Sequence, residues 1–211
     1  MTGSNRFAER LTSENAVFAS IDHQTGLLVG CRDIDPTVLK SNILGLAHLA
    51  RILDLPTVVT SSVATGPNGP VMPEISDTLP DARFIGRDGE INAWDSPEFK
   101  RAIEETGRKK IIMAGIVTDV CLMFPAISAV AEGYDVYAVI DASGTWDAAI
   151  RDAAVHRMSQ AGVKVATWAS VLAEIMGDWR SPKGRELGEL MSSRLTSYGW
   201  VVDGFTAHGA S

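Results

Sequence analysis

The sequence is poor in cysteine: its 211 residues include only two, Cys31 and Cys121, which lie far apart along the chain. Neither belongs to a Cys-x-x-Cys pair or to a cluster with histidine, the patterns typical of redox pairs and structural zinc sites. Disulfide-dense scaffolds are small secreted domains that pair many cysteines. The sequence therefore argues against a disulfide framework or a zinc-stabilised fold, and it favours a reducing compartment.

Long apolar runs and excess positive charge are also missing. No stretch approaches the roughly 20 residues that a membrane-spanning helix needs. The first 15 residues are polar and include Arg6, Glu9, Arg10 and Glu14, unlike a signal peptide. The 19 Lys and Arg residues against 26 Asp and Glu residues give a net charge of −7, which argues against nucleic acid or an anionic membrane as a partner. We therefore expect a cytoplasmic protein.

What the sequence does contain is the composition of a globular domain, with 45% hydrophobic and 21% charged residues. Short apolar runs rich in β-branched residues alternate with segments of helical periodicity. The alternation predicts an α/β fold, in which helices cover both faces of a parallel sheet. We expect one domain over residues 1–176 and a C-terminal extension over 177–211 that packs on the domain or on a neighbouring subunit. The expected strands lie at 16–21, 57–60, 82–85, 111–115, 136–140 and 163–168, and the expected helices at 38–53, 97–105, 126–132, 146–161, 171–176 and 187–195.

Three chemically active side chains follow expected strands. Asp22 comes directly after the first strand, Arg87 shortly after the third, and Cys121 follows the fourth at the start of a helix. Because ligands bind beyond the carboxyl ends of parallel strands, we expect these side chains to lie along one edge of the sheet. Backbone N–H groups at a helix N-terminus stabilise a thiolate, which predicts a lowered pKa for Cys121. An inert buried cysteine and a turn-capping aspartate are the alternatives.

Seven short segments extend this pattern over most of the chain. They are Asp22–Leu28 (DHQTGLL), Thr65–Pro70 (TGPNGP), Ile91–Asp95 (INAWD), Ala114–Cys121 (AGIVTDVC), Asp141–Thr145 (DASGT), Arg157–Gly162 (RMSQAG) and Asp178–Arg180 (DWR). In this order the set resembles the isochorismatase-like cysteine hydrolase superfamily, and within it the YcaC-like subgroup. The resemblance implies the isochorismatase-like hydrolase fold, a three-layer α/β/α sandwich around a parallel sheet, and an enzyme that needs no cofactor.

The resemblance also implies roles for individual residues. By position, Asp22 is the catalytic acid and Cys121 the nucleophile, whereas the lysine of the family is replaced by Arg87. Arginine stays protonated and presents a rigid fork, so Arg87 can hold the thiolate and orient Asp22 but is a poor proton carrier. The family has a cis peptide four residues before the cysteine, here between Ile116 and Val117. The N–H groups of Val117 and Cys121 would then form an oxyanion hole.

The implied reaction is hydrolysis of a small amide or related acyl compound. The acid takes the thiol proton, the thiolate attacks the carbonyl carbon, and water clears the thioester acyl-enzyme. A small-molecule substrate needs a pocket, and several residues near the expected sheet edge are candidates for its wall. Aromatic residues at such spacing equally suit the core. The possible pocket residues are Gln24, Asn92, Trp94, Phe124 and Trp146.

Two other functions stay open at this point. Arg87 in place of lysine favours a catalytically weakened member that binds small molecules or serves in assembly. A thiol-based redox protein is the second alternative, and the lack of a cysteine near Cys121 in the sequence disfavours it. Nicotinamidases of the superfamily carry an Asp-x-His metal cluster after the second strand, where this chain has Ser61 and Ser62, so we expect no metal. YcaC-like proteins form large homo-oligomers, and the resemblance implies an octamer-like assembly here.

Overall fold

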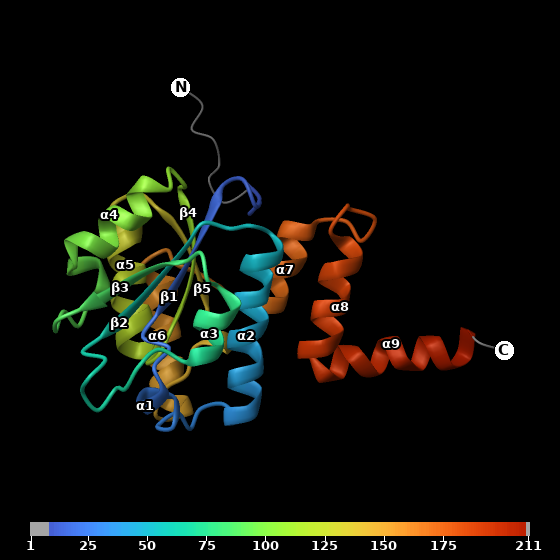
Figure 1. Cartoon of the computed structure of the whole chain (residues 1–211), viewed down its shortest axis with the longest axis horizontal. Helices are drawn as coiled ribbons and strands as arrows, with labels where there is room; N and C mark the ends of the chain where they lie inside the picture. The colour runs from blue at the N-terminus through green and yellow to red at the C-terminus, as the bar shows by residue number, and fades with distance from the viewer. Residues whose placement is uncertain (1–8, 210–211) are drawn as a thin grey trace.

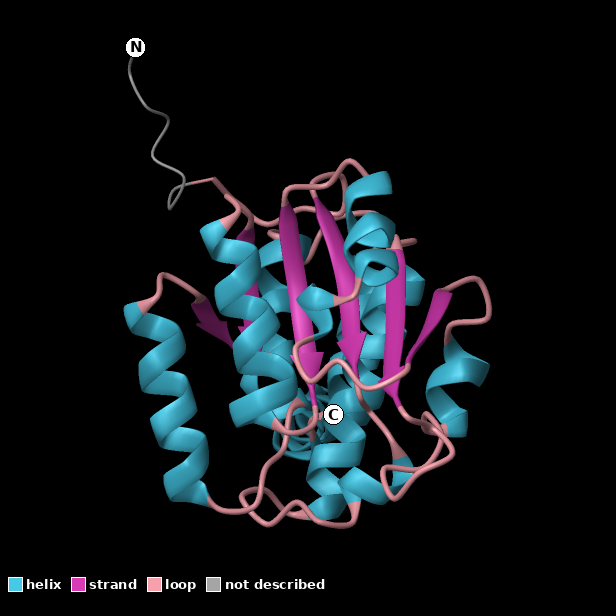
Figure 2. Ribbon diagram, turned by 90° about the vertical axis from the view of Figure 1, so that its left-hand side faces the viewer, coloured by secondary structure: helices cyan, strands magenta, loops and turns pink. Residues whose placement is uncertain are grey.

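The sheet has six parallel strands and helices on both faces, as Figures 1 and 2 show. The computed structural model describes residues 9–209. The strand order is β3-β2-β1-β4-β5-β6, and β1 and β4 lie at the centre. This arrangement confirms the predicted three-layer α/β/α sandwich. The strands are β1 (Ala16–Ile21), β2 (Thr57–Ser62), β3 (Arg83–Arg87), β4 (Lys110–Gly115), β5 (Asp135–Val139) and β6 (Lys164–Ala166).

The helices form two layers around the sheet. α2 and α7 pack together on one face, whereas α5 and α6 pack together on the other. The α-helices are α1 (Thr25–Leu28), α2 (Pro36–Ile52), α3 (Pro73–Thr78), α4 (Pro97–Glu105), α5 (Met123–Ala131), α6 (Ala148–Gln160), α7 (Trp168–Met176), α8 (Gly184–Arg194) and α9 (Thr196–Gly209). Three shorter turns complete them: η1 (Ala93–Asp95), the π-helical turn η2 (Thr118–Leu122) and η3 (Ile140–Ala142).

The predicted start of α4 is confirmed in detail. Ser96 caps the helix, its side chain accepts the N–H of Phe99, and Pro97 occupies the first helical position. A capping hydroxyl satisfies an N–H that has no partner within the helix, and proline at this position loses no hydrogen bond. The helix ends at Glu105, and Gly107 follows it with a positive φ of 68°.

The last strand is shorter than predicted. It ends at Ala166, and Trp168, which we expected to close the strand, is instead the first residue of α7. The Thr167 side chain accepts the N–H of Ser170 in a capping box that starts the helix. The Trp168 ring is fully buried, and its Nε1 donates to Asn42 Oδ1 at 2.9 Å. The apolar run therefore changes from strand to helix at a polar capping residue.

Asp141 lies beside this helix start and is expected to control stability between about pH 4 and pH 6. Its Oδ1 accepts the N–H of Trp168 at 2.8 Å, and burial raises the pKa of the carboxyl from 3.8 to about 6. The folded state therefore holds this proton more tightly than the unfolded state does. The contribution of Asp141 to the free energy of unfolding falls as the pH rises through this range.

The Asp141→Asn variant keeps the acceptor and removes the charge. We expect it to exceed the native chain in free energy of unfolding by about 1–3 kcal/mol at pH 7, and by much less at pH 4. Urea unfolding at both pH values measures the difference. Asp77→Asn, at an exposed position of α3, is the control for removing a carboxylate that is not buried. An equal difference at both pH values would show that the carboxyl does not titrate in this way.

The C-terminal residues form a helical arm, which we define as α8 and α9. α8 packs against α2 and against α9, and α9 extends away from the sandwich in Figure 1. Only 187–195 was predicted as helical in this region, so α8 is confirmed in part and the 14-residue α9 was not predicted. Its side chains Trp200, Val201 and Phe205 are 65–79% exposed. Within residues 9–209, no helix has both the length and the apolar character needed to cross a membrane.

Candidate active site

The strand order brings Asp22, Arg87 and the segment that carries Cys121 to the carboxyl edge of the sheet. Asp22 directly follows β1 at the centre, and Arg87 is the last residue of β3. β2 lies between these two strands, and the side chain of its Thr60 bonds Arg87. η2, with Cys121 as its fourth residue, follows β4 on the other side of β1.

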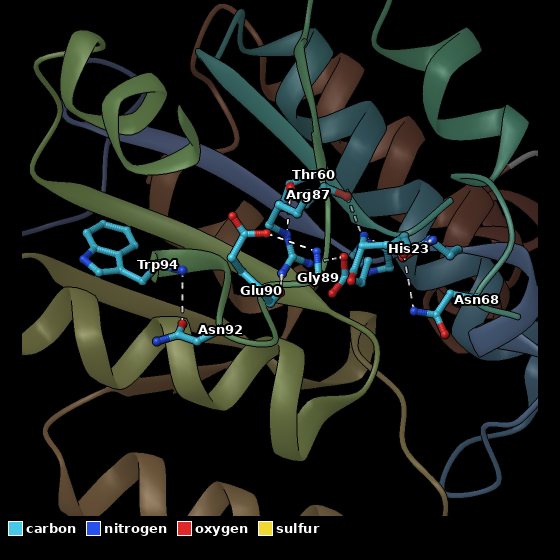
Figure 3. A network of polar contacts seen from close by, with 12 residues as sticks. His23, Thr60, Asn68, Arg87, Gly89, Glu90, Asn92 and Trp94 are labelled. Atoms are coloured by element: carbon cyan, nitrogen blue, oxygen red, sulfur yellow. Dashed lines mark hydrogen bonds and ion pairs between the residues drawn. The ribbon is translucent and has the colours of Figure 1, made fainter. Parts of the chain in front are cut away.

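The Arg87 guanidinium is held in three directions. Its two terminal nitrogens donate to Asp22 Oδ1 and to the Glu90 carbonyl, and its Nε donates to Thr60 Oγ1 at 3.1 Å (Figure 3). Asp22 is 1% exposed and Arg87 is 3% exposed. A buried charge is tolerated when it is paired and hydrogen-bonded, as both are here. The acid and the cation predicted from separate strands therefore form one buried ion pair.

The Asp22 backbone has an uncommon conformation at this site. Its φ is +53°, in the left-handed region where aspartate and asparagine are enriched among residues with a side chain. The Asp22 N–H donates to the Thr60 carbonyl at 2.9 Å, and the Asp22 carbonyl accepts the N–H of Gln24 at 2.7 Å. These contacts hold the turn from which the carboxylate bonds Arg87.

Cys121 lies in a turn whose hydrogen bonds converge on one carbonyl. The Val117 oxygen accepts the N–H groups of Val120 at 3.2 Å, Cys121 at 2.8 Å and Leu122 at 3.2 Å. The peptide bond between Ile116 and Val117 is cis. Of the two N–H groups expected to hold an oxyanion, that of Cys121 thus has an acceptor within the turn. The Val117 N–H, on a residue that is 5% exposed, has no acceptor within residues 9–209.

The predicted lowering of the Cys121 pKa is wrong in this structure. The thiol is 9% exposed, and burial raises its pKa above the ordinary value. The charge of Asp22 and a hydrogen bond with its carboxylate raise it further. The charge of Arg87 opposes them and is outweighed. Desolvation and a neighbouring anion therefore dominate over the helix start, and the resting side chain is a neutral thiol.

His23 follows the acid but has a structural role. It is 1% exposed, its Nδ1 lies 2.7 Å from Ser20 Oγ, and its Nε2 lies 2.9 Å from the Ala142 carbonyl. Burial lowers the pKa of the imidazole from 6.5 to about 4. At neutral pH the uncharged ring accepts from the serine and donates to the carbonyl. It ties the end of β1 to η3, next to the site.

Three of the five expected pocket residues have structural partners. Both ends of the buried Gln24 amide bond the Ser62 backbone, with Nε2 at 3.0 Å from its oxygen and Oε1 at 3.1 Å from its nitrogen. Asn92 caps η1, where its Oδ1 accepts the Trp94 N–H at 3.1 Å. The Trp94 ring is 5% exposed and packs edge-on against Phe99 and Tyr134. For Trp94 the core alternative therefore applies.

The other two expected pocket residues keep accessible surface. Phe124 is partly buried, and the Arg157 guanidinium lies over its ring at 5.6 Å. Trp146 is 44% exposed and packs against Gly30, where a Cβ would meet the indole ring at 2.5 Å. These two aromatic residues follow η2 and β5, so they stay candidates for the rim of the site.

Two contacts that hold the Arg87 guanidinium were not predicted from the sequence. Thr60 belongs to a buried β-branched strand, and nothing in the run Thr57–Thr60 distinguishes its hydroxyl from that of a packing residue. The Glu90 carbonyl is a backbone group and leaves no signal in the sequence. The part of the chain that the structure describes contains no group of three or more His, Cys, Asp or Glu side chains that could hold a metal ion.

Comparison with known proteins places this geometry in a family. The isochorismatase domain model matches residues 16–170. YcaC of Escherichia coli K12, named a probable hydrolase, is 46% identical over 189 residues, which cover 90% of each protein. Two solved structures match at TM-scores of 0.91 and 0.90. The first is YcaC from Pseudomonas aeruginosa with hexane-2,5-diol and covalent acrylamide, 44% identical, covering 94% of this chain and 98% of that one.

The second structure is Escherichia coli YcaC, described as an octameric hydrolase of unknown specificity. It is 45% identical, and the match covers 94% of this chain and 97% of that one. The matched family domain includes β1 to β6 and all three residues at the sheet edge. The chain therefore belongs to the isochorismatase family of hydrolases, in which it is YcaC-like.

Proposed function

We propose that the chain is a cysteine hydrolase that acts on a small amide or a related acyl compound. The observation that carries the proposal is the buried Asp22–Arg87 ion pair, both of whose charges act on the Cys121 thiol. A thiol attacks a carbonyl poorly unless a base takes its proton. Asp22 is the base within reach, and Arg87 keeps a full charge next to it.

In the proposed first step, Asp22 accepts the Cys121 proton while sulfur forms a bond to the substrate carbonyl carbon. The carbonyl oxygen becomes an oxyanion, for which the free N–H of Val117 is a donor. When the C–N bond breaks, the amine leaves with the proton from Asp22, and a thioester remains on Cys121. Asp22 then deprotonates a water molecule that attacks the thioester. The acid is released, and the proton returns to sulfur.

The protonation state of the thiol favours a small amide as the substrate class. The thiol is protonated at rest, so a carboxylate that accepts its proton during attack suits acyl transfer, in which the leaving amine needs a proton. The Pseudomonas aeruginosa relative carries covalent acrylamide. Nucleophiles add to acrylamide at its alkene carbon, so the 44% identity over most of the chain supports a reactive nucleophile here and does not bear on amide cleavage. Among the described residues the two cysteines are free thiols and form no disulfide, which disfavours a redox reaction through a thiol pair.

Mass spectrometry of the intact protein tests this proposal. After incubation with a panel of small amides and acyl esters, the expected result is an acyl group on Cys121 and release of the free acid. Added oxygen on sulfur would favour a thiol-based redox protein. An unmodified protein that binds panel compounds without releasing acid would favour a small-molecule-binding or assembly role.

We also propose that the helical arm is an assembly element attached to the hydrolase domain of residues 1–176. The Escherichia coli relative is octameric, and α9 presents Trp200 and Phe205 at 70% and 79% exposure. Large apolar side chains exposed together on one helix are typical of a protein–protein interface. The occupant we propose is a second copy of this chain.

Replacing Trp200 and Phe205 by glutamate is therefore expected to give smaller particles than the native chain, because the charges oppose apolar contact. Light scattering coupled to size-exclusion chromatography measures the change. Thr206→Glu, on the exposed surface of the same helix, is the matched control. A double variant of native particle size would remove α9 from the account of assembly.

A further inference from the structure

Thr60 contacts both halves of the buried ion pair. Its side-chain Oγ1 accepts the Arg87 Nε–H at 3.1 Å, and its backbone carbonyl accepts the Asp22 N–H at 2.9 Å. The residue is 1% exposed and lies on β2, the strand between those of the acid and the cation. Figure 3 shows the threonine directly against the arginine side chain. No other residue among those described bonds both partners in this way.

The hydroxyl contact depends on arginine. Nε lies inside the side chain, before the guanidinium carbon, and lysine has no N–H at that place. With Nε on Thr60, one terminal nitrogen on the Glu90 carbonyl and the other on Asp22, the plane of the guanidinium is fixed. A rigid fork held at three points keeps its charge at one distance from its neighbours, which a flexible ammonium does not do.

We propose that Thr60 is a positioning residue that adapts this site to arginine: its hydroxyl orients Arg87, and through Arg87 it sets the readiness of Cys121 to lose its proton. The inference deepens the proposed function and rests on it for the roles of the two residues. The cation in this chain is accordingly a fixed charge that stabilises the developing thiolate, and proton movement belongs to Asp22 alone. The arginine is then a working alternative to the lysine of the family.

Alkylation of Cys121 by iodoacetamide tests the inference without any acyl substrate. The rate constant is measured by mass spectrometry between pH 6 and pH 9, and peptide mapping separates Cys121 from the fully buried Cys31. Thr60→Val keeps the shape of the side chain and removes the acceptor. We expect it to slow alkylation about tenfold at each pH, because a displaced cation stabilises the thiolate less.

Two controls separate positioning from packing. Thr60→Ser restores the hydroxyl and is expected to react within about twofold of the native rate. Thr57→Val, at the other end of β2, where the hydroxyl donates to the Leu55 carbonyl, should react at the native rate. A native rate for Thr60→Val, or equal slowing by the serine variant, would overturn the inference. If the valine variant does not fold, Thr60→Ala replaces it in the same comparison.

A double-mutant cycle separates positioning of Arg87 from a purely structural role of Thr60, because only positioning makes the effect of Thr60→Val on the alkylation rate depend on Arg87. In an Arg87→Lys background no Nε–H is present, so Thr60→Val should change the alkylation rate less than about twofold. The same tenfold loss in both backgrounds would mean that the threonine acts on the strand and not through the guanidinium, and the inference would fail. Absence of amide hydrolysis with these alkylation results intact would count against the proposed reaction only.

Discussion

Replacing Cys121 by alanine is expected to abolish hydrolysis. The proposed reaction passes through a bond between sulfur and the acyl carbon, and the nearby hydroxyls of Ser20 and Thr60 are already bonded to His23 and Arg87. Removing the nucleophile of such a site costs on the order of 10⁴-fold or more in kcat, which leaves only the effects of binding and oxyanion donors. The acyl adduct seen by mass spectrometry should disappear together with the release of acid.

Folding of this variant should be unaffected in its main features. Cys121 is at the margin of the core, and alanine leaves the N–H that donates to Val117 in place. Cys31→Ala is the matched control, since it removes the other thiol from a fully buried position and should keep its turnover. Turnover by Cys121→Ala at more than a hundredth of the native rate would exclude nucleophilic catalysis by this residue.

Replacing Asp22 by asparagine is expected to damage both stability and activity. The amide preserves the size of the side chain and tolerates the positive φ of 53°, but it leaves the Arg87 charge buried without a counter-ion. Breaking a buried pair in this way costs about 3–5 kcal/mol. Loss of the base that takes the thiol proton should lower kcat by about 10²–10⁴-fold.

Urea unfolding and hydrolysis of the best panel substrate measure these two effects separately. Asp77→Asn, exposed on α3, is the control for a simple change of net charge and should alter neither. Adding Arg87→Met to Asp22→Asn removes the unpaired cation. This double variant should regain part of the lost stability and none of the activity. A fully stable and active Asp22→Asn protein would contradict the role of the pair in both.

The sheet was predictable because its signals are local. The β-branched run at Thr57–Thr60 follows Pro56, and the apolar run at Ile111–Gly115 ends in glycine. Both runs are too short for core helices, so they predict buried strands. Ser96 before Pro97 specified a helix start in the same way. Parallel strands place their carboxyl ends together, so the convergence of the acid and the cation followed from topology without knowledge of any distance.

The environment of the thiol was not predictable in this way. A helix start suggested a lowered Cys121 pKa, but the sign depends on how much water reaches the sulfur and on which charge lies nearest, and both are long-range properties. The hydrogen bonds that Arg87 donates to Thr60 and to the Glu90 carbonyl also depend on the folded structure, so the sequence does not reveal them. Trp94 shows the limit for apolar residues, since an indole suits a pocket wall and a core equally until its neighbours are known.

The order of the strands also has a consequence for synthesis of the protein. β1, β2 and β3 fill one half of the sheet in the order in which a ribosome makes them, so Asp22, Thr60 and Arg87 emerge before Cys121. A nascent polypeptide interrupted between Arg87 and η2 carries the charged pair without Cys121. Under the proposed mechanism, products that end before η2 are expected to be unable to cleave acyl compounds, however much of the first half of the sheet they fold.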